Sequence, residues 1–366
     1  MTQTTEGAEL CFPQLLNSSC RKPEPPRSEA LLVYILLFVI SLLTTVLNLL
    51  VIISISHFRH VNLHTHCAVL RFKMTFAKLC YHKLNWLLVD IIGNHINKDD
   101  VFCHRRELHT PTNLLLLSLA VSDFLVGLLV MPVEILMTLS CWVLADLICP
   151  VYYLLPFIIL CSSVVNMVLI SCDRYVAICY PLHYPARVTP KVSTVCVILC
   201  WVYSVIYSVL ILFDNLKHPG RYNSCHGECV VHISGTVDLV VNFLVPVSII
   251  ILANGRVFVV AVSQARAMKT NVKVRVKKSE LKAAKTLGVL IVVFLMCYSP
   301  FYSVALTGHD IFVGSSVEVF MVFLMYFNSC LNPIIYALFY PWFKKTTRLI
   351  VTLQILKANS CGAKLL

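Results

Sequence analysis

The chain has 366 residues, of which 58% are hydrophobic and 13% are charged, and its mean hydropathy is +0.80. Soluble domains carry roughly 25% charged residues, so the composition excludes an ordinary soluble enzyme or binding domain and indicates an integral membrane protein. The net charge of +12 does not indicate a nucleic-acid partner, because the basic residues cluster beside apolar segments, where membrane topology explains them.

Seven apolar runs follow one another along the chain, each long enough to cross a bilayer as a helix. Helices are expected because lipid offers no hydrogen-bond partners to open backbone. The sequence therefore predicts an all-α fold, a seven-transmembrane helix bundle. It has a tail of residues 1–30, a membrane domain of residues 31–340, and an amphipathic helix and tail at residues 341–366. The runs are 31–56, 112–138, 147–172, 192–213, 235–261, 284–307 and 314–340.

Basic residues predict the orientation of these spans. Residues 266–282 hold seven lysines and arginines against Glu280 alone, and three more basic residues occur at 344–348, so both segments are expected on the cytoplasmic side of the plasma membrane. Seven spans then place the N-terminus outside the cell. Asn17 begins the only Asn-X-Ser/Thr sequence of the chain, in that outer tail, which makes it the predicted glycosylation site.

Six of the seventeen cysteines fall on the outer side in this topology. An even number of cysteines in an oxidising compartment permits three disulfides and leaves their connectivity open. The other cysteines lie in spans or cytoplasmic segments, where free thiols are expected, and the spacing of cysteine and histidine fits no metal site. The six are Cys11, Cys20, Cys141, Cys149, Cys225 and Cys229.

Two motifs carry a resemblance to a known family. The motif SCDRYVAICYPLHY, which contains Asp173, Arg174 and Tyr175, follows the third span, and the seventh span contains NSCLNPIIYALFYPWF at residues 328–343. The chain resembles a rhodopsin-like G-protein-coupled receptor and, through the second motif, more closely a trace amine-associated receptor. Shorter matches occur in the other spans, and the resemblance covers everything except residues 60–106.

The resemblance implies a receptor, not an enzyme, that binds a small volatile amine in olfaction and signals through a stimulatory G protein and cyclic AMP. It also implies that Arg174 pairs with Asp173 and Glu280 in the closed state, and that opening this contact exposes a cleft for the G protein. The same switch is expected to include Tyr175, Asn332, Pro333 and Tyr336.

Asp123 lies deep in the second span and needs polar partners there. In the resembled family the equivalent aspartate contributes to a pocket for an allosteric sodium ion, together with positions that match Ser163, Asn328 and Asn332. A hydrogen-bonded structural cluster is the alternative interpretation. No other cofactor and no metal centre is expected.

The position where related aminergic receptors carry the ligand-binding aspartate holds Pro156, 18 residues before Arg174, and no acidic residue occurs in residues 147–172. The fifth span instead carries Asp238, eight residues before Pro246 and about two turns nearer the outer face. A carboxylate at this level can bind an ammonium group through a charge-assisted hydrogen bond. The chain here resembles a fish branch of the family in which the acid has moved to the fifth helix. A structural role for the carboxylate, through internal pairing or the helix dipole, is the alternative.

Five aromatic residues are expected to surround the ligand and to offer cation–π contacts, although aromatic residues at helical spacing also form ordinary core. Glu134 and Glu318, near the outer ends of the second and seventh spans, are candidates for a second ammonium group of a diamine, or else simply face water. The five aromatic residues are Phe157, Tyr298, Phe301, Tyr302 and Tyr326.

The resemblance also implies a pattern of disulfides. Cys149 at the start of the third span is expected to pair with Cys229 in the second outer loop, as is common in the superfamily. In trace amine-associated receptors a cysteine placed like Cys225 pairs with the N-terminal tail, which would then cover the ligand cavity. The predicted tail pairs are Cys11 with Cys225 and Cys20 with Cys141.

Residues 60–106 do not fit the family, and their apolar part is too short to span a membrane. A translated intron or a gene-model error explains them better than a functional insertion. Tyr298 and Asn254 occupy positions where the family usually has tryptophan and tyrosine, respectively, so signalling is less firmly implied than ligand binding. Two other functions stay open: a non-signalling receptor relic disabled by the insertion and, with less support, a transporter, for which paired internal repeats are not evident.

Overall fold

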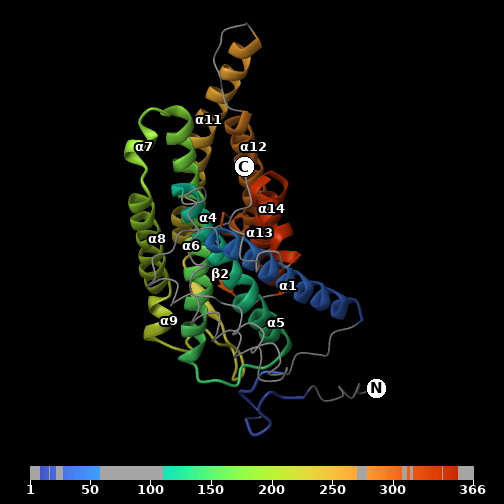
Figure 1. The fold of residues 1–366 in the computed structure, drawn as a ribbon. Coiled ribbons are helices and arrows are strands. Elements are labelled where there is room, and N and C mark those ends of the chain that lie inside the picture. Colours follow the sequence, from blue (N-terminus) through green and yellow to red (C-terminus); the bar gives the residue numbers. More distant parts are fainter. Residues whose placement is uncertain are drawn as a thin grey trace, which may run out of the picture.

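The computed structural model describes residues 9–15, 17–21, 28–57, 110–269, 278–306, 311–313, 316–339 and 341–352. Most of the long helices run along one direction, and α1 lies obliquely to them (Figure 1). The anomalous residues 60–106 lie outside the described residues, which are mostly helical. The bundle consists of α1 (Ser28–His57), α4 (Pro111–Leu125), η1 (Val126–Val130), α5 (Met131–Leu139), α6 (Ile148–Cys179), α8 (Pro190–Ile211), α10 (Gly235–Asp238), η2 (Leu239–Leu244), α11 (Val245–Lys269), α12 (Lys278–Ala305), α13 (Ser316–Phe339) and α14 (Pro341–Val351).

The described helices confirm the predicted all-α bundle. Six segments are long and apolar enough to cross a membrane, and the remaining predicted run corresponds to α12, whose described apolar part, Gly288–Ser303, is shorter. The six are Leu31–Ser56, Pro111–Leu139, Ile148–Cys179, Pro190–Ile211, Gly235–Val260 and Met321–Leu338.

The surface of the bundle is apolar, as a lipid-facing surface must be. Leu252 on α11 is 71% exposed and Leu210 on α8 is 66% exposed. Only 22% of the most apolar stretches of α1 and α8 is buried, against 72% for the span Pro111–Leu139. That span is therefore the most buried of the six, and α1 and α8 lie at the periphery of the bundle.

Two prolines account for the π-helical turns. A proline lacks a backbone N–H and clashes with the carbonyl group four residues earlier. Pro246 follows η2, and the carbonyl it would meet belongs to Asn242 within η2; Pro132 has the same relation to Leu128 within η1. The wider turn absorbs the clash and keeps each helix continuous. In the fifth span this π-helical turn begins directly after Asp238.

A third proline links α13 to α1. Pro333 cannot donate to the carbonyl of Ser329, four residues earlier. The side chain of Asn48, fully buried on α1, donates from Nδ2 to that carbonyl at 2.9 Å and to the carbonyl of Thr44 at 3.0 Å. The hydrogen bond that the proline removes is thus replaced by a contact between two helices.

We call the end of the bundle that carries Cys149 and the N-terminal tail the disulfide end, and the opposite end, which carries Asp173–Tyr175, the DRY end. At the disulfide end β1 (Val231–Ile233) pairs antiparallel with β2 (Ile311–Val313), with His232 opposite Phe312. This pairing joins the connection before the fifth span to the connection before α13. Two further short helices lie in the connections, α7 (Tyr184–Arg187) at the DRY end and α9 (Phe213–Lys217) at the disulfide end.

Candidate functional site

A small cavity, here called the inner cavity, lies between the helices in the half of the bundle nearer the disulfide end. Its volume is about 50 Å³, and α5, α6, α12, α13 and the fifth span all contribute to its wall. All six residues predicted to contact the ligand line it: Asp238, Phe157, Tyr298, Phe301, Tyr302 and Tyr326. The model thus brings them together around one space.

Asp238 is 3% exposed and is held by neutral donors. Its Oδ1 accepts a hydrogen bond from the Tyr207 hydroxyl at 2.6 Å and another from Asn242 Nδ2 at 2.8 Å. The Tyr302 hydroxyl lies beside the same carboxylate. Within the described part of the chain, no lysine, arginine or histidine forms an ion pair with Asp238. Because a carboxylate has two oxygens with about four acceptor sites, Oδ2 has capacity for one more donor.

Tyr207 and Asn242 were not predicted as site residues. Asn242 stands four residues after Asp238, so the two lie on one helical face, and this spacing is a usable sequence signal. Tyr207 comes from α8, and no sequence signal connects it to Asp238. Pro156 of the third span also lines the inner cavity. The position at which related aminergic receptors carry an aspartate is therefore part of this site, and here it holds no acid.

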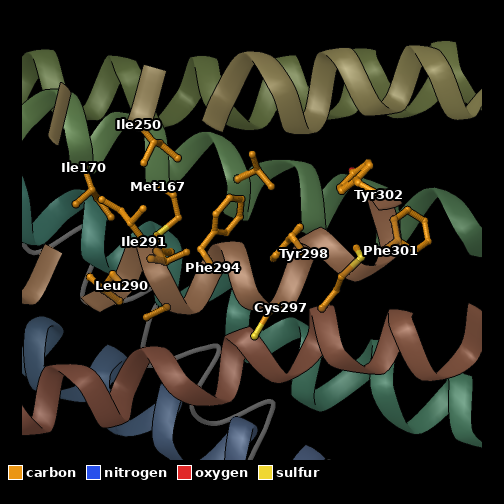
Figure 2. Close-up of a cluster of buried hydrophobic side chains, with 14 of the residues drawn as sticks. Met167, Ile170, Ile250, Leu290, Ile291, Phe294, Cys297, Tyr298, Phe301 and Tyr302 are labelled. Carbon is orange, nitrogen blue, oxygen red and sulfur yellow. The ribbon is translucent and has the colours of Figure 1, made fainter. Parts of the chain in front are cut away.

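The aromatic residues of α12 continue from the inner cavity into the core (Figure 2). Tyr302 stacks on Phe243 of η2 with ring centroids 4.7 Å apart and meets Phe301 edge-on at 5.2 Å. Tyr298, one turn nearer the DRY end, is 2% exposed and lies 4.4 Å from Phe294, centroid to centroid. Figure 2 shows this row beside Met167 of α6 and Ile250 of α11. Two groups of packed rings, Tyr302 with Phe243 and Phe301, and then Tyr298 with Phe294, therefore follow one another along α12 from the cavity.

A second space, the outer cavity, lies at the disulfide end and has a volume of about 360 Å³. Its lining includes Cys11, Cys20 and Arg21 of the tail and Glu228 of the connection between α9 and β1. Three residues line both cavities: Glu134, Tyr153 and Val322. The two cavities are therefore neighbours that meet at these three side chains.

The tail segment of residues 9–21, here called the tail hairpin, covers the outer cavity. Leu10 bridges Arg21 in antiparallel fashion, and Cys11 N donates to Cys20 O at 2.9 Å. Ser19 bridges His226, whose backbone N donates to Ser18 O at 2.7 Å. The hairpin is thus hydrogen-bonded through its backbone to the connection between α9 and β1.

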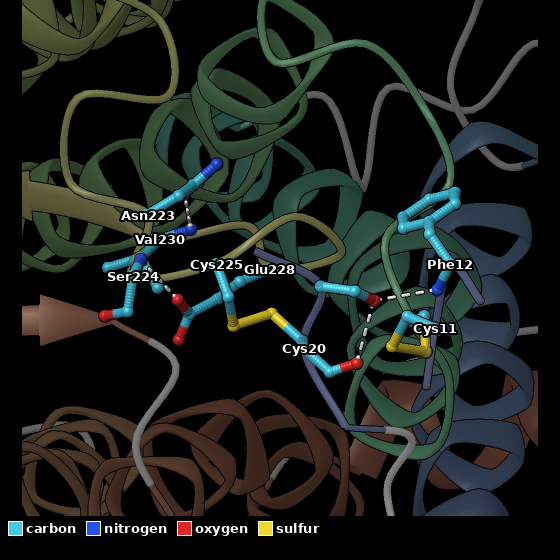
Figure 3. The surroundings of a disulfide bond; sticks show 10 residues. Cys11, Phe12, Cys20, Asn223, Ser224, Cys225, Glu228 and Val230 are labelled. Carbon is cyan, nitrogen blue, oxygen red and sulfur yellow. Dashed lines mark hydrogen bonds between the residues drawn. A yellow bond between two sulfur atoms is a disulfide. The ribbon is translucent and has the colours of Figure 1, made fainter. Parts of the chain in front are cut away.

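The disulfides correct the predicted tail pairs. Cys149 bonds to Cys229 as expected, but Cys11 bonds to Cys141 and Cys20 bonds to Cys225, so the predicted pairs Cys11–Cys225 and Cys20–Cys141 are wrong. The hairpin explains the exchange, because it holds Cys11 and Cys20 side by side and the Ser19–His226 bridge carries Cys20 to Cys225 (Figure 3). Gly227 adopts φ +107°, and a Cβ there would lie 2.9 Å from Cys11 Cβ. Glycine at this position therefore leaves room for the Cys11–Cys141 disulfide.

A polar cluster surrounds Asp123 of α4. Asp123 is fully buried, and its Oδ2 accepts from Asn332 Nδ2 at 2.8 Å. Ser163 Oγ lies 3.4 Å from Asp123 Oδ1 and 3.0 Å from Ser122 Oγ. The side-chain carbonyl oxygens of Asn328 and Asn332 are buried and have no hydrogen-bond partner among the described residues. The carboxyl group and the orphaned amide oxygen atoms together form a donor set that suits a hard cation.

At the DRY end the arginine is paired with its neighbour. Arg174 Nη2 lies 2.6 Å from Asp173 Oδ2, and the same nitrogen donates to Thr112 Oγ1 of α4. The Tyr184 hydroxyl of α7 donates to Asp173 Oδ1 at 2.8 Å. The expected pairing with Glu280 falls on a side chain outside the described residues. Tyr175 packs edge-on against Tyr180, and the buried Pro333 and Tyr336 of the seventh-span motif lie on α13.

Comparisons with known proteins agree with this architecture. A family model described as "7 transmembrane receptor (rhodopsin family)" matches residues 100–336. Trace amine-associated receptor 13c of Danio rerio is 31% identical to the chain over 382 aligned positions, which cover 100% of the chain and 98% of that relative. Trace amine-associated receptor 7h of Rattus norvegicus is 36% identical over 72% of the chain and 79% of its own length. Trace amine-associated receptor 7a of Mus musculus is 32% identical over 80% of the chain and 94% of its own length.

Proposed function

Because the chain belongs to the trace amine-associated receptors, within the rhodopsin family of seven-transmembrane receptors, we propose that it binds a small amine in the inner cavity through Asp238. The family is one of receptors and not of enzymes, and its membrane-spanning helices make the chain a multi-pass protein of the plasma membrane. The ligand class is supported by the names of the relatives and by the chemistry of the cavity.

The observation that carries this proposal is a buried carboxylate with no cationic partner among the described residues. A charge at this depth is costly unless it is paired, and Tyr207 and Asn242 supply only neutral donors. An ammonium group at Oδ2 would complete the pair with a charge-assisted hydrogen bond. The surrounding tyrosine and phenylalanine rings add cation–π attraction of ~0.5 to 2 kcal/mol each.

The disulfide end is assigned to the outside of the cell and the DRY end to the cytoplasm. Disulfides persist in oxidising surroundings, and the basic segments 266–282 and 344–348 are expected on the cytoplasmic side. Asn17 is exposed on the tail hairpin, which is accessible for the predicted glycosylation. Amines would then enter from outside through the outer cavity.

Signalling is proposed to run along α12 to a G protein of the stimulatory type, raising cyclic AMP in olfactory cells. A ligand shifts the receptor towards the open state only if it binds that state more tightly than the closed one. The aromatic residues of α12 from Tyr302 to Phe294 would be the route by which a ligand beside Asp238 favours one packing of α12 over another. Opening at the DRY end would free Arg174 from Asp173 and expose the surface for the G protein.

Asp123, Ser163, Asn328 and Asn332 are proposed to hold an allosteric sodium ion. The buried carboxylate and the orphaned amide oxygens fit such an ion. When bound, sodium would be the cationic partner of the Asp123 carboxylate. Asn332 belongs to this cluster and to the seventh-span switch motif, so it couples the two.

The test is a cyclic-AMP reporter assay with volatile monoamines and diamines on cells expressing the receptor, normalised to surface staining. Asp238→Ala is expected to raise the half-maximal concentration by about a hundredfold or more, because it removes one partner of a buried charge pair. Asp238→Glu should retain part of the response, since the charge stays.

Asp214→Asn is the matched control for that test. Asp214 is an exposed carboxylate of α9 at the same end of the bundle, and the Tyr222 hydroxyl, 2.6 Å away, is the main cause that lowers its pKa below the ordinary value. It is therefore charged at neutral pH, but it does not line the inner cavity. An amine response that survives Asp238→Ala, or is lost equally in Asp214→Asn, contradicts the assignment.

A further inference from the structure

Glu134 is a second buried acid that the amine site described above does not use. It lies on α5, is 8% exposed, and its Oε1 accepts a hydrogen bond from the Tyr152 hydroxyl at 3.2 Å. Within the described part of the chain it forms no ion pair. Arg21 lines the outer cavity as Glu134 does, yet the two are not paired. A buried carboxylate with one neutral donor is costly, so a cation that arrives from elsewhere would be favoured there.

The position of Glu134 relates it to Asp238 through the two cavities. Asp238 lines the inner cavity only, whereas Glu134 lines the inner and the outer cavity. Of all the residues that line the inner cavity, these two are the acidic ones. One carboxylate thus stands in the inner cavity and the other stands where that cavity meets the outer one.

The volumes indicate how a ligand must lie. The inner cavity, about 50 Å³, is far below the roughly 300 Å³ of ordinary ligand pockets and suits little more than the end of a molecule that carries an ammonium group. The outer cavity, about 360 Å³, has room for the remainder. A ligand that is bound at Asp238 and extends into the outer cavity therefore passes Glu134 and Tyr153, which line both cavities, and lies near the buried ring of Tyr326 in the inner one.

We propose that Glu134 is a second ammonium site and that the preferred ligand is a linear diamine, with one ammonium group at Asp238, the other at Glu134, and a methylene chain between them. The proposal rests on the amine site at Asp238. A monoamine satisfies one of the two carboxylates and leaves the other without a cation, while a diamine satisfies both. The methylene chain packs against tyrosine rings, which suits its apolar surface.

The experiment compares a series of α,ω-diamines of increasing chain length with the n-alkylamines of the same lengths, using cyclic AMP and the thermal stability of the purified receptor as readouts. Stabilisation on binding reports affinity even where signalling is weak. We expect one optimal diamine length. At that length the half-maximal concentration of the diamine should be lower than that of the matched monoamine by about tenfold or more. Glu134→Gln should remove this advantage and leave the monoamine response within about threefold of the wild type.

Glu134→Asp gives a second, independent result. Its carboxylate is retracted by one methylene group, so the optimal diamine should become about one methylene longer. A merely structural role for Glu134 predicts no such shift. Glu228→Gln is the control for general attraction of cations, because Glu228 lines the outer cavity but not the inner one, and it accepts a hydrogen bond from Ser224 N at 2.8 Å.

The outcomes separate this inference from the proposed amine site. Equal losses for diamines and monoamines in Glu134→Gln, no optimal length, or the same effect in Glu228→Gln would overturn the role of Glu134 while Asp238→Ala still abolishes binding. Survival of binding in Asp238→Ala would instead overturn the amine site itself, whatever the diamine series shows.

Discussion

Asp238 receives both of its shortest hydrogen bonds on a single oxygen, from Tyr207 and Asn242. Such donors fix the carboxylate plane and direct the remaining oxygen, Oδ2. Asn242 is drawn from the same helix, but Tyr207 comes from α8, a peripheral helix. The orientation of the proposed amine-binding group therefore depends on a helix that contributes no residue to the lining of the inner cavity.

Tyr207→Phe is expected to weaken amine activation about tenfold, because it removes one hydrogen bond to a charged acceptor. Cyclic-AMP dose–response curves measure the shift. Tyr203→Phe is the control, since the Tyr203 ring stacks on Tyr207 with centroids 6.2 Å apart and its change should leave the curve in place. Identical curves for Tyr207→Phe and the wild type would show that Asp238 needs no support from α8.

The sequence was sufficient to predict the inner cavity at the level of single residues. The resemblance to the family supplied Pro246 and Arg174 as reference positions, from which the depth of Asp238 and Pro156 was counted along the helices. The sequence was not sufficient to predict Tyr207, since nothing along the chain records which side chains of α8 face the fifth span. Nor could the sequence predict the cavity that Glu134 and Asp238 both line, because this cavity forms only when the helices pack together.

The helices differ from the predicted spans mainly at their DRY ends. The third span was predicted to end at residue 172, but α6 continues to Cys179, and α11 continues to Lys269 beyond the predicted residue 261. Hydropathy marks where lipid ends, whereas backbone hydrogen bonding continues into polar sequence. The compensation at Pro333 by Asn48 could not be foreseen from the sequence.

Close approach between α1 and η1 makes one glycine indispensable. A Cβ on Gly127 would lie 2.8 Å from Thr45 N and 2.9 Å from Ser41 O, and Ser41 Oγ donates to the Gly127 carbonyl at 2.7 Å. Gly127→Ala is expected to lower the stability by ~1 to 3 kcal/mol, the usual cost of overpacking. Thermal denaturation in detergent measures this loss.

Gly255→Ala is the matched control for that substitution. A Cβ on Gly255 of α11 meets nothing within 4 Å, so the helix should tolerate alanine or gain slightly from it. A comparable melting temperature for both variants would mean that α1 can move away from η1 without penalty.

The whole molecule is closed at one end by covalent bonds that tie the tail to two different connections. Cys141 follows α5, and Cys225 belongs to the connection between α9 and β1. The family resemblance was sufficient for the Cys149–Cys229 bond but not for the tail pairs, because connectivity is decided by the hairpin geometry. No spacing along the chain distinguishes Cys11 from Cys20.

Double substitutions test this connectivity. Each single serine variant is expected to lose ~2 to 4 kcal/mol of stability. Combining Cys11→Ser with Cys141→Ser should add little to either change alone, because both remove the same bond, whereas combining Cys11→Ser with Cys225→Ser should add the two losses. Melting temperatures of the purified variants provide the measurement, and the reverse pattern of additivity would restore the originally predicted pairs.

The tail hairpin is anchored on both sides of its tip, by Cys11 before it and by Cys20 after it. The tip itself, residues 13–15, is exposed. A peptidase that cut there would nick the chain without detaching either piece, since each new terminus keeps its own disulfide bond to the body of the receptor. The cover over the entrance can thus be opened by hydrolysis, yet it cannot be shed until a reductant also acts.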